Sequence, residues 1–259
     1  MKHTLLSILT IGACSLTSHA AVILAHEYHL GEAGSLSGAD TIPQDSAGSA
    51  HFTAPSGAGT ATVETAGVFA PGSTAYISTA DTSKGWFGAD FTSLPADNFA
   101  FGIFARAASN TTATRGVAFQ LGTNTNNTLK ITLNNNGWGA SAHGVSWIGG
   151  TQGVSGSFVA DEWVHLALIR QSGTTTLYID GAAQTGTWGG TPVFGSGHMV
   201  VTPGGGTYFD GHLDEGRVVT FDPSDSTTAI LNTLQGVPEP SSTALLGLGA
   251  MALILRRRK

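Results

Sequence analysis

The stretch Asp161–Gly181, DEWVHLALIRQSGTTTLYIDG, decides the fold class of this chain. From Trp163 to Arg170 the residues are apolar on both faces of an extended strand, since successive side chains point to opposite sides. Such a run predicts a central strand that is covered on both sides. Leu177–Ile179 is a second apolar run, and it ends at Asp180-Gly181, a dipeptide typical of tight hairpin turns.

Strand signals of this kind recur along the chain, at Phe99–Arg106, Val117–Leu121, Thr128–Leu133 and Leu213–Phe221. One segment, Ser224–Gln235, has a helical pattern, with Asp225 or Ser224 as its predicted cap. Many strands joined by Gly-rich turns predict an all-β, two-sheet antiparallel sandwich or jelly roll. The absence of an internal linker before Gly236 predicts a single domain over residues 21–236.

The charge of this predicted domain argues against one class of partner. Residues 21–236 contain six Lys or Arg and 16 Asp or Glu, a net charge near −10, against −6 for the whole chain. An acidic domain without a basic patch is not expected to bind nucleic acid. The one cysteine, Cys14, lies before the domain, so we expect no disulfide in it.

The N-terminus has the parts of a secretory signal peptide. Lys2 precedes the apolar run Leu5–Ala13, and small residues lead to a predicted cut after Ala20, so residues 1–20 would be removed. Ile11–Cys14 resembles a bacterial lipobox, which leaves lipidation of Cys14 open.

The C-terminus, residues 237–259, combines three features. Pro238, Glu239 and Pro240 form a Pro-Glu-Pro motif, and the apolar stretch Ser241–Leu255 carries no charge. The basic cluster that follows, Arg256, Arg257, Arg258 and Lys259, predicts a membrane helix whose end is held in the cytoplasm. The apolar stretch is 15 residues long, short of the roughly 20 that span a bilayer comfortably.

These three features in this order resemble the PEP-CTERM sorting tail of Gram-negative bacteria. The resemblance implies processing near the Pro-Glu-Pro motif by an exosortase-type peptidase. It also implies an exported protein whose precursor is anchored in the inner membrane before it reaches the cell envelope, surface or extracellular matrix.

The domain itself resembles the laminin-G/concanavalin A-like (LamG) jelly roll. The resemblance lies in the Trp163-x-His165-x-Ala167 strand, the Leu177–Gly181 hairpin and the closing segment Gly211–Arg217, in that order. Tyr28–Glu32 also resembles the first strand of that family. In the wider family the Asp that opens the closing strand often binds Ca²⁺. The resemblance therefore implies a structural Ca²⁺ at Asp214, with Asp45 as a weaker second ligand, unless Asp214 pairs with Arg217.

The sequence disfavours hydrolysis, although this fold class includes glycoside hydrolases. Retaining glycosidases need two carboxyl groups about 5 Å apart on one face. The pairs Asp161-Glu162 and Asp214-Glu215 are adjacent, so their side chains are expected on opposite faces of a strand. We therefore expect no catalytic residues.

Carbohydrate binding is the candidate activity of the domain. Trp138 lies in the Asn134–Gly139 segment and Trp188 in Gly186–Gly190, where polar and small neighbours would leave an indole free to stack on a sugar ring. The alternative is that these tryptophans seal the sandwich edges. We predict a non-catalytic, exported surface or exopolysaccharide-associated protein. A purely structural or adhesive envelope protein without a small ligand and a divergent glycoside hydrolase are the alternatives.

Overall fold

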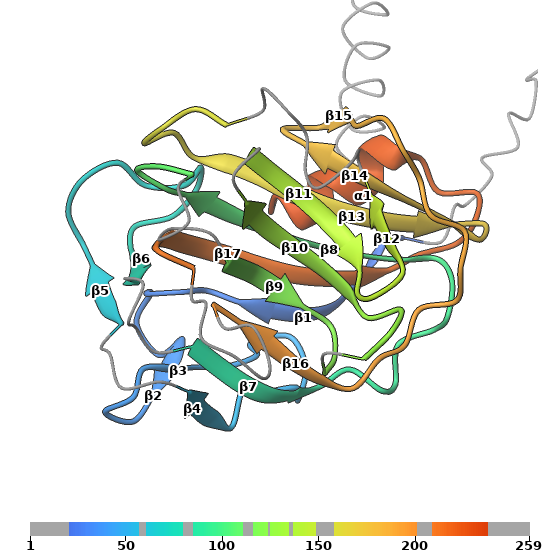
Figure 1. Cartoon of the computed structure of the whole chain (residues 1–259). Coiled ribbons are helices and arrows are strands. Elements are labelled where there is room, and N and C mark those ends of the chain that lie inside the picture. Colours follow the sequence, from blue (N-terminus) through green and yellow to red (C-terminus); the bar gives the residue numbers. More distant parts are fainter. Residues whose placement is uncertain are drawn as a thin grey trace, which may run out of the picture.

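The computed structural model describes residues 21–56, 61–79, 85–110, 116–123, 125–134, 137–148, 158–200 and 209–237. It confirms an all-β, two-sheet sandwich with one short helix, and Figure 1 shows the two sheets stacked face to face. The predicted signal peptide and the sorting tail from Pro238 onward lie outside the described residues. Within the described ranges, no helix combines the length and the apolar character needed to cross a membrane.

One sheet has eight strands in the order β15-β14-β13-β8-β17-β6-β5, and β1 pairs with the second half of β17, on the same edge as β6. Its strands are β1 (Ile23–Tyr28), β5 (Thr62–Glu64), β6 (Tyr76–Thr79), β8 (Phe99–Arg106), β13 (Val164–Gln171), β14 (Thr174–Ile179), β15 (Ala182–Ala183) and β17 (Gly211–Thr220). The strand predicted at Trp163–Arg170 is β13, which lies between β8 and β14 and is buried on both faces. Asp180 and Gly181 form the predicted turn, both with positive φ.

The other sheet has seven strands in the order β12-β11-β10-β9-β16-β7-β4. They are β4 (Ala54–Ser56), β7 (Gly85–Asp90), β9 (Gly116–Gln120), β10 (Leu129–Asn134), β11 (Gly137–Ala142), β12 (Ser146–Ile148) and β16 (Ser196–Met199). A separate hairpin pairs β2 (Leu36–Ser37) with β3 (Ile42–Pro43).

The two faces of the seven-stranded sheet differ in chemistry. Leu129, Ile131 and Leu133 of β10 point into the core between the sheets, so Lys130 and Thr132 point outward. On this outer face, one row of residues runs across adjacent strands, and each residue lies opposite the next. In order, the row is Trp147, Ser141, Lys130, Gln120, His198 and Phe87. The row crosses six of the seven strands and carries an aromatic ring at each end.

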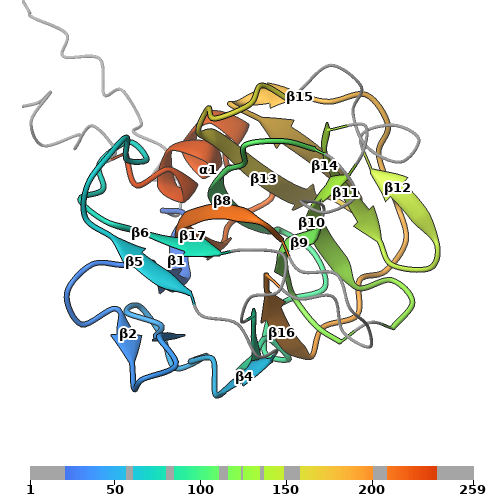
Figure 2. The ribbon, with the colours of Figure 1, turned by 60° about the vertical axis from the view of Figure 1, so that its left-hand side comes forward.

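Helix α1 (Thr227–Leu234) covers the outer face of the eight-stranded sheet. Its cap is Ser226, whose Oγ accepts a hydrogen bond from the Ala229 N–H, so the prediction of Asp225 or Ser224 as cap is wrong by one or two residues. Asp225 instead accepts a hydrogen bond from the Asp222 N–H in the preceding turn. Ile230, Leu231 and Leu234 are buried against the sheet, as their spacing predicts. Figure 2 shows α1 on one side of the sandwich and β12 on the other.

Candidate functional site

Neither tryptophan that the sequence offered for sugar stacking is exposed. Trp138 lies in β11 with 0 % exposure and packs beside Phe158 and Phe209, at ring-centroid distances of 6.2 and 5.9 Å. Trp188 is also in the core, and the Arg170 guanidinium lies 5.7 Å from the centre of its ring. The expectation that their indoles are free to stack on a sugar is therefore wrong, and both pack within the sandwich, as in the alternative. Their glycine neighbours indicated a loop at Trp138, but Gly137 and Gly139 belong to β11.

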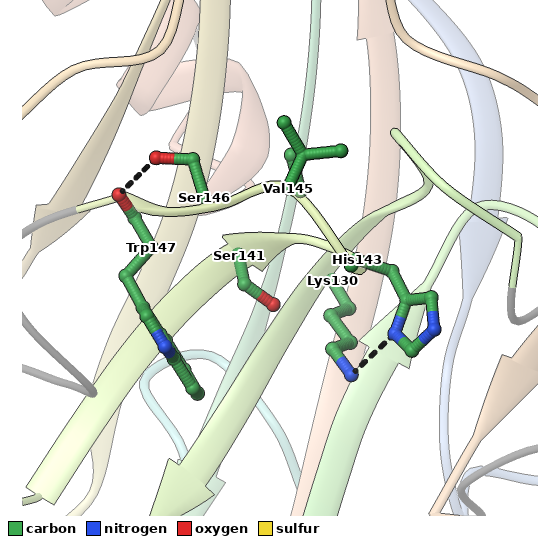
Figure 3. Close-up of a pocket in the computed structure, with 8 residues that line it drawn as sticks. Lys130, Ser141, His143, Val145, Ser146 and Trp147 are labelled. Carbon is green, nitrogen blue, oxygen red and sulfur yellow. Dashed lines mark hydrogen bonds between the residues drawn. The ribbon is translucent and has the colours of Figure 1, made fainter.

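A different tryptophan, Trp147, stands at the surface. It is 37 % exposed and lies in β12, directly opposite Ser141 of β11. It lines a pocket of about 270 Å³, which we call the Trp147 pocket. The other lining residues are Lys130, Ser141, Ala142, His143, Gly144, Val145 and Ser146. Figure 3 shows Trp147 and Lys130 on either side of Ser141, with the three side chains extending to the same side of the sheet.

Polar atoms without partners gather at this pocket and next to it. Ser141 Oγ, Thr132 Oγ1 and Gln120 Oε1 are buried and have no hydrogen-bond partner. Ser141 and Gln120 are the two cross-strand neighbours of Lys130, and Thr132 shares its face of β10. Because a buried polar group without a partner costs about 1–3 kcal/mol, such a group is normally paired with protein, water or ligand. This part of the face thus has hydrogen-bonding capacity that the fold itself does not use.

Lys130 and His143 form one edge of the Trp147 pocket. The Lys130 ammonium donates to His143 Nδ1 at 3.3 Å, which places the proton of the neutral ring on Nε2. Burial lowers the pKa of Lys130 from its ordinary value. Burial and the neighbouring charge of Lys130 also lower the pKa of His143.

Asp45 does not lie with Asp214, so the predicted pairing of the two as calcium ligands is wrong. Asp45 Oδ2 accepts hydrogen bonds from His26 Nδ1 at 2.7 Å and from a backbone N–H of the loop that follows, and Oδ1 accepts three more backbone N–H groups. Burial raises the pKa of Asp45, but these hydrogen bonds outweigh it and hold the pKa at about 2. Both oxygens are used within the fold, so Asp45 fixes the first loop.

Asp214 meets two other carboxylates instead. Single carboxylate oxygens of Glu32, Asp214 and Glu215 lie within 4.8 Å of one another, and we call this group the carboxylate cluster. The alternation rule failed for Asp214 and Glu215 because β17 carries a bulge between Asp214 and Arg217, where Glu215 has φ of 48°. The bulge allows side chains of adjacent residues to converge.

Two oxygens of the carboxylate cluster lack partners. Asp214 is 0 % exposed, and its Oδ2 has no hydrogen bond; Glu32 Oε2 is also buried and unpartnered. Burial, with the charges of Glu32 and Glu215, raises the pKa of Asp214 to about 8, although the Ser73 hydroxyl opposes the rise. Hard oxygen donors that face one another form the kind of ligand set that Ca²⁺ prefers.

Glu215 also belongs to an ion-pair network that joins β1, β17 and α1. Arg217 donates to Glu27 Oε1 at 2.8 Å, to Glu215 Oε2 and to the Leu234 carbonyl of α1 at 3.2 Å. His29 bridges Glu215 at 2.8 Å and Glu27 at 3.0 Å. Hydrogen bonds to Glu215 and then Glu27 raise the pKa of His29 to about 10. The hydrogen bond from His29, opposed by burial and aided by Arg217, lowers the pKa of Glu27 to about 2.

Two family models match the chain. One, described as the concanavalin A-like lectin/glucanases superfamily, matches residues 71–226, which is more than half of the chain. The other, the PEP-CTERM protein-sorting motif, matches residues 236–259. No curated protein matches the chain in sequence.

Solved structures share the fold at low identity. Domain 4 of AbnA, a GH43 extracellular arabinanase from Geobacillus stearothermophilus in complex with arabinotriose, matches with a TM-score of 0.56 and 15 % identity, over 82 % of this chain and 100 % of that one. Trypanosoma rangeli sialidase matches with a TM-score of 0.53 and 11 % identity, over 82 % of this chain and 32 % of the sialidase chain. At these identities the likeness concerns the fold alone.

Proposed function

Since the chain belongs to the concanavalin A-like lectin/glucanases superfamily and carries an envelope-sorting motif, we propose that it is a non-catalytic surface protein that binds carbohydrate in the Trp147 pocket. The observation that carries the proposal is the exposed indole of Trp147 beside the buried, unpartnered hydroxyl of Ser141. A sugar ring presents an apolar face and a rim of hydroxyl groups. An aromatic side chain with adjacent polar groups matches both parts.

The size of the pocket agrees with this ligand class. At about 270 Å³ it lies just below the ~300–1,000 Å³ typical of small-molecule pockets, so it suits one sugar residue of a longer chain. The bound arabinotriose of the AbnA domain supports the proposal by analogy of fold, not by shared residues.

Replacing Trp147 with alanine is expected to weaken glycan binding at least about 10-fold, which corresponds to roughly 1.4 kcal/mol. The measurement is calorimetric titration of the full-length protein with oligosaccharides selected on a glycan array. Phe87→Ala is the matched control, because Phe87 is a similarly exposed aromatic on the same sheet face but lies outside the pocket. The proposal fails if no glycan is retained, or if both variants bind as tightly as the wild-type protein.

The carboxylate cluster supports the non-catalytic part of the proposal. Its spacing resembles the ~5 Å separation of the two carboxylates in a retaining glycosidase. However, Asp214 is fully buried, and both oxygens of Glu215 are engaged by His29 and Arg217. Asp214 is out of reach of a sugar, and the oxygens of Glu215 are already bonded, so neither carboxyl group is suited to act as acid or nucleophile. Sugar release from a polymer by the purified protein would contradict this part.

The sorting motif indicates an exported protein of the cell envelope, and it implies an exosortase-type peptidase as processing partner. We propose the finer steps of the route from the sequence. The signal peptide of residues 1–20 is removed, Arg256–Lys259 hold the precursor at the inner membrane, and processing occurs near Pro238–Pro240. An extracellular polysaccharide is the proposed partner after release.

We also propose that the carboxylate cluster holds a structural Ca²⁺, with Asp214 and Glu32 as its side-chain ligands. The unpartnered oxygens of these two residues fit such an ion, which would supply the positive charge that the buried carboxylates lack. The ion would join the segment after β1 to β17.

Calcium at a concentration about 100 times its Kd is expected to stabilise the protein by about 2.7 kcal/mol and to raise Tm by about 5–10 °C. Asp214→Asn should remove this response and should stabilise the calcium-free protein, because burial raises the pKa of this carboxyl group to about 8 and so opposes folding, whereas asparagine does not titrate. Asp161→Asn, the same change at an exposed position, should keep the response. The measurement is calorimetric melting with EDTA or CaCl₂. A full calcium response in Asp214→Asn would exclude this site.

A further inference from the structure

Lys130 differs from the described arginines in its lack of an acidic partner. Arg106, Arg170 and Arg217 each lie within ion-pair distance of a carboxylate. Among the residues that the structure describes, no carboxylate lies within 4.0 Å of Lys130. Its one recorded side-chain partner is the neutral ring of His143, which accepts a hydrogen bond but brings no negative charge.

The surroundings of Lys130 increase the cost of this unpaired charge. The side chain is half-buried, and burial alone lowers its pKa, with no acid to oppose the effect. Ser141 Oγ, a buried hydroxyl without a partner, lies on the neighbouring strand at the position paired with Lys130. An ammonium group and a free hydroxyl on one wall of a pocket form a donor set suited to the oxygens of an anion.

Resting on the proposed carbohydrate binding, we infer that the Trp147 pocket selects an acidic sugar, one that carries a carboxylate or sulfate group, and that Lys130 and Ser141 bind that group. The sugar ring stacks on Trp147, which faces Lys130 across Ser141 (Figure 3). The ligand thus supplies the negative charge that the domain does not place beside Lys130.

The net negative charge of the domain does not prevent this binding. Charges farther from the pocket than the Debye length, about 8 Å at physiological ionic strength, are largely screened. The contact between Lys130 and the bound anion is short and partly shielded from water, so it is screened much less. The local cation therefore decides selectivity, and the overall charge mainly slows the approach of a polyanion.

The test compares matched oligosaccharides that differ in charge. The probes are oligogalacturonate and its methyl ester for the carboxylate, and a sulfated galactan oligomer and its desulfated form for the sulfate. The full-length wild-type protein is expected to bind at least one acidic form about 10-fold or more tightly than its neutral counterpart at low salt. A rise from about 0.05 to 0.5 M NaCl should reduce this preference.

Substitutions at Lys130 separate charge from structure. Lys130→Gln should bring the ratio of acidic to neutral affinity close to one, whereas Lys130→Arg should retain the preference for the acidic form. Thermal melting of each variant establishes that the domain remains folded. Equal binding of acidic and neutral forms, with a loss in Trp147→Ala, would overturn the acidic-sugar inference and leave the proposed function standing. Binding of none of the probes, and of no glycan on the array, would overturn both.

Discussion

Replacing Arg217 with methionine is expected to lower the free energy of unfolding by about 3–5 kcal/mol, the usual cost of removing one partner from a buried ion pair. The variant removes one of the two cations that hold Glu27 and Glu215 and leaves His29 as the other, and the Leu234 carbonyl loses a donor. Arg217 connects the first strand, the last strand and the helix, so its loss affects all three. Urea unfolding at pH 5.5 measures the effect.

The choice of pH follows from the titration of the network. Glu27, with its folded pKa near 2, stabilises the protein fully above its ordinary pKa of 4.5 and loses that contribution as the pH falls toward 2. His29, with its folded pKa near 10, stabilises fully below 6.5 and loses its contribution as the pH rises toward 10. Between about pH 4.5 and 6.5 both contributions are present, so the network is fully charged at pH 5.5, where Arg217→Met is compared with the wild-type protein.

Arg106→Met is the control for this prediction. Arg106 pairs with Asp161 at 3.6 Å near the surface, where such pairs contribute about 0–1 kcal/mol. If Arg217→Met cost no more than Arg106→Met, the network would add nothing to the stability of the fold.

Replacing Trp138 with alanine is expected to destabilise the protein by about 3–5 kcal/mol, because the side chain is fully buried and its removal leaves a cavity. The indole fills the space between β11 and the rings of Phe158 and Phe209. Denaturant unfolding followed by circular dichroism provides the measurement. Trp138→Phe should cost less, since most of the volume is kept and the buried Nε1, which lacks a hydrogen bond, is removed.

Trp147→Ala is expected to lower glycan binding and not stability. Comparing it with Trp138→Ala therefore separates the packing of the core from ligand recognition. The stability of Trp147→Ala should change by no more than about 0.5 kcal/mol, since the side chain is partly exposed, while glycan binding falls. The folded fraction of Trp138→Ala should bind glycan like the wild-type protein. If Trp138→Ala lost glycan binding but kept its stability, Trp138 would be a ligand-binding residue and not a core residue.

The strands were predictable from the sequence where burial repeats with a fixed period. Phe99–Arg106 was predicted with the bounds of β8, and the strands at β13 and β17 were predicted to within two residues at each end. Alternation fails where the backbone leaves the regular pleat. At Asp214 and Glu215 the bulge of β17 brings adjacent carboxylates together. The position of a bulge cannot be predicted from the alternation of apolar and polar residues.

The sites were harder to predict because their residues meet through tertiary packing. Glu32 and Asp214 are far apart in sequence, and their meeting depends on how the first loop lies against the last strand. Trp138 and Trp147 both have small neighbours, but register buries the first and exposes the second. The row that contains Lys130 exists only once β9, β10 and β11 are paired.

The position of Val237, the last described residue, determines which side of the domain lies next to the sorting tail. Val237 lies three residues after the end of α1, which covers one side of the sandwich, whereas β12, the strand of Trp147, lies on the other side (Figure 2). The Arg217 hydrogen bond to the Leu234 carbonyl ties the last turn of α1 to β17. An anchor joined to the chain at this point would leave the proposed Trp147 pocket on the side of the domain that faces away from the membrane.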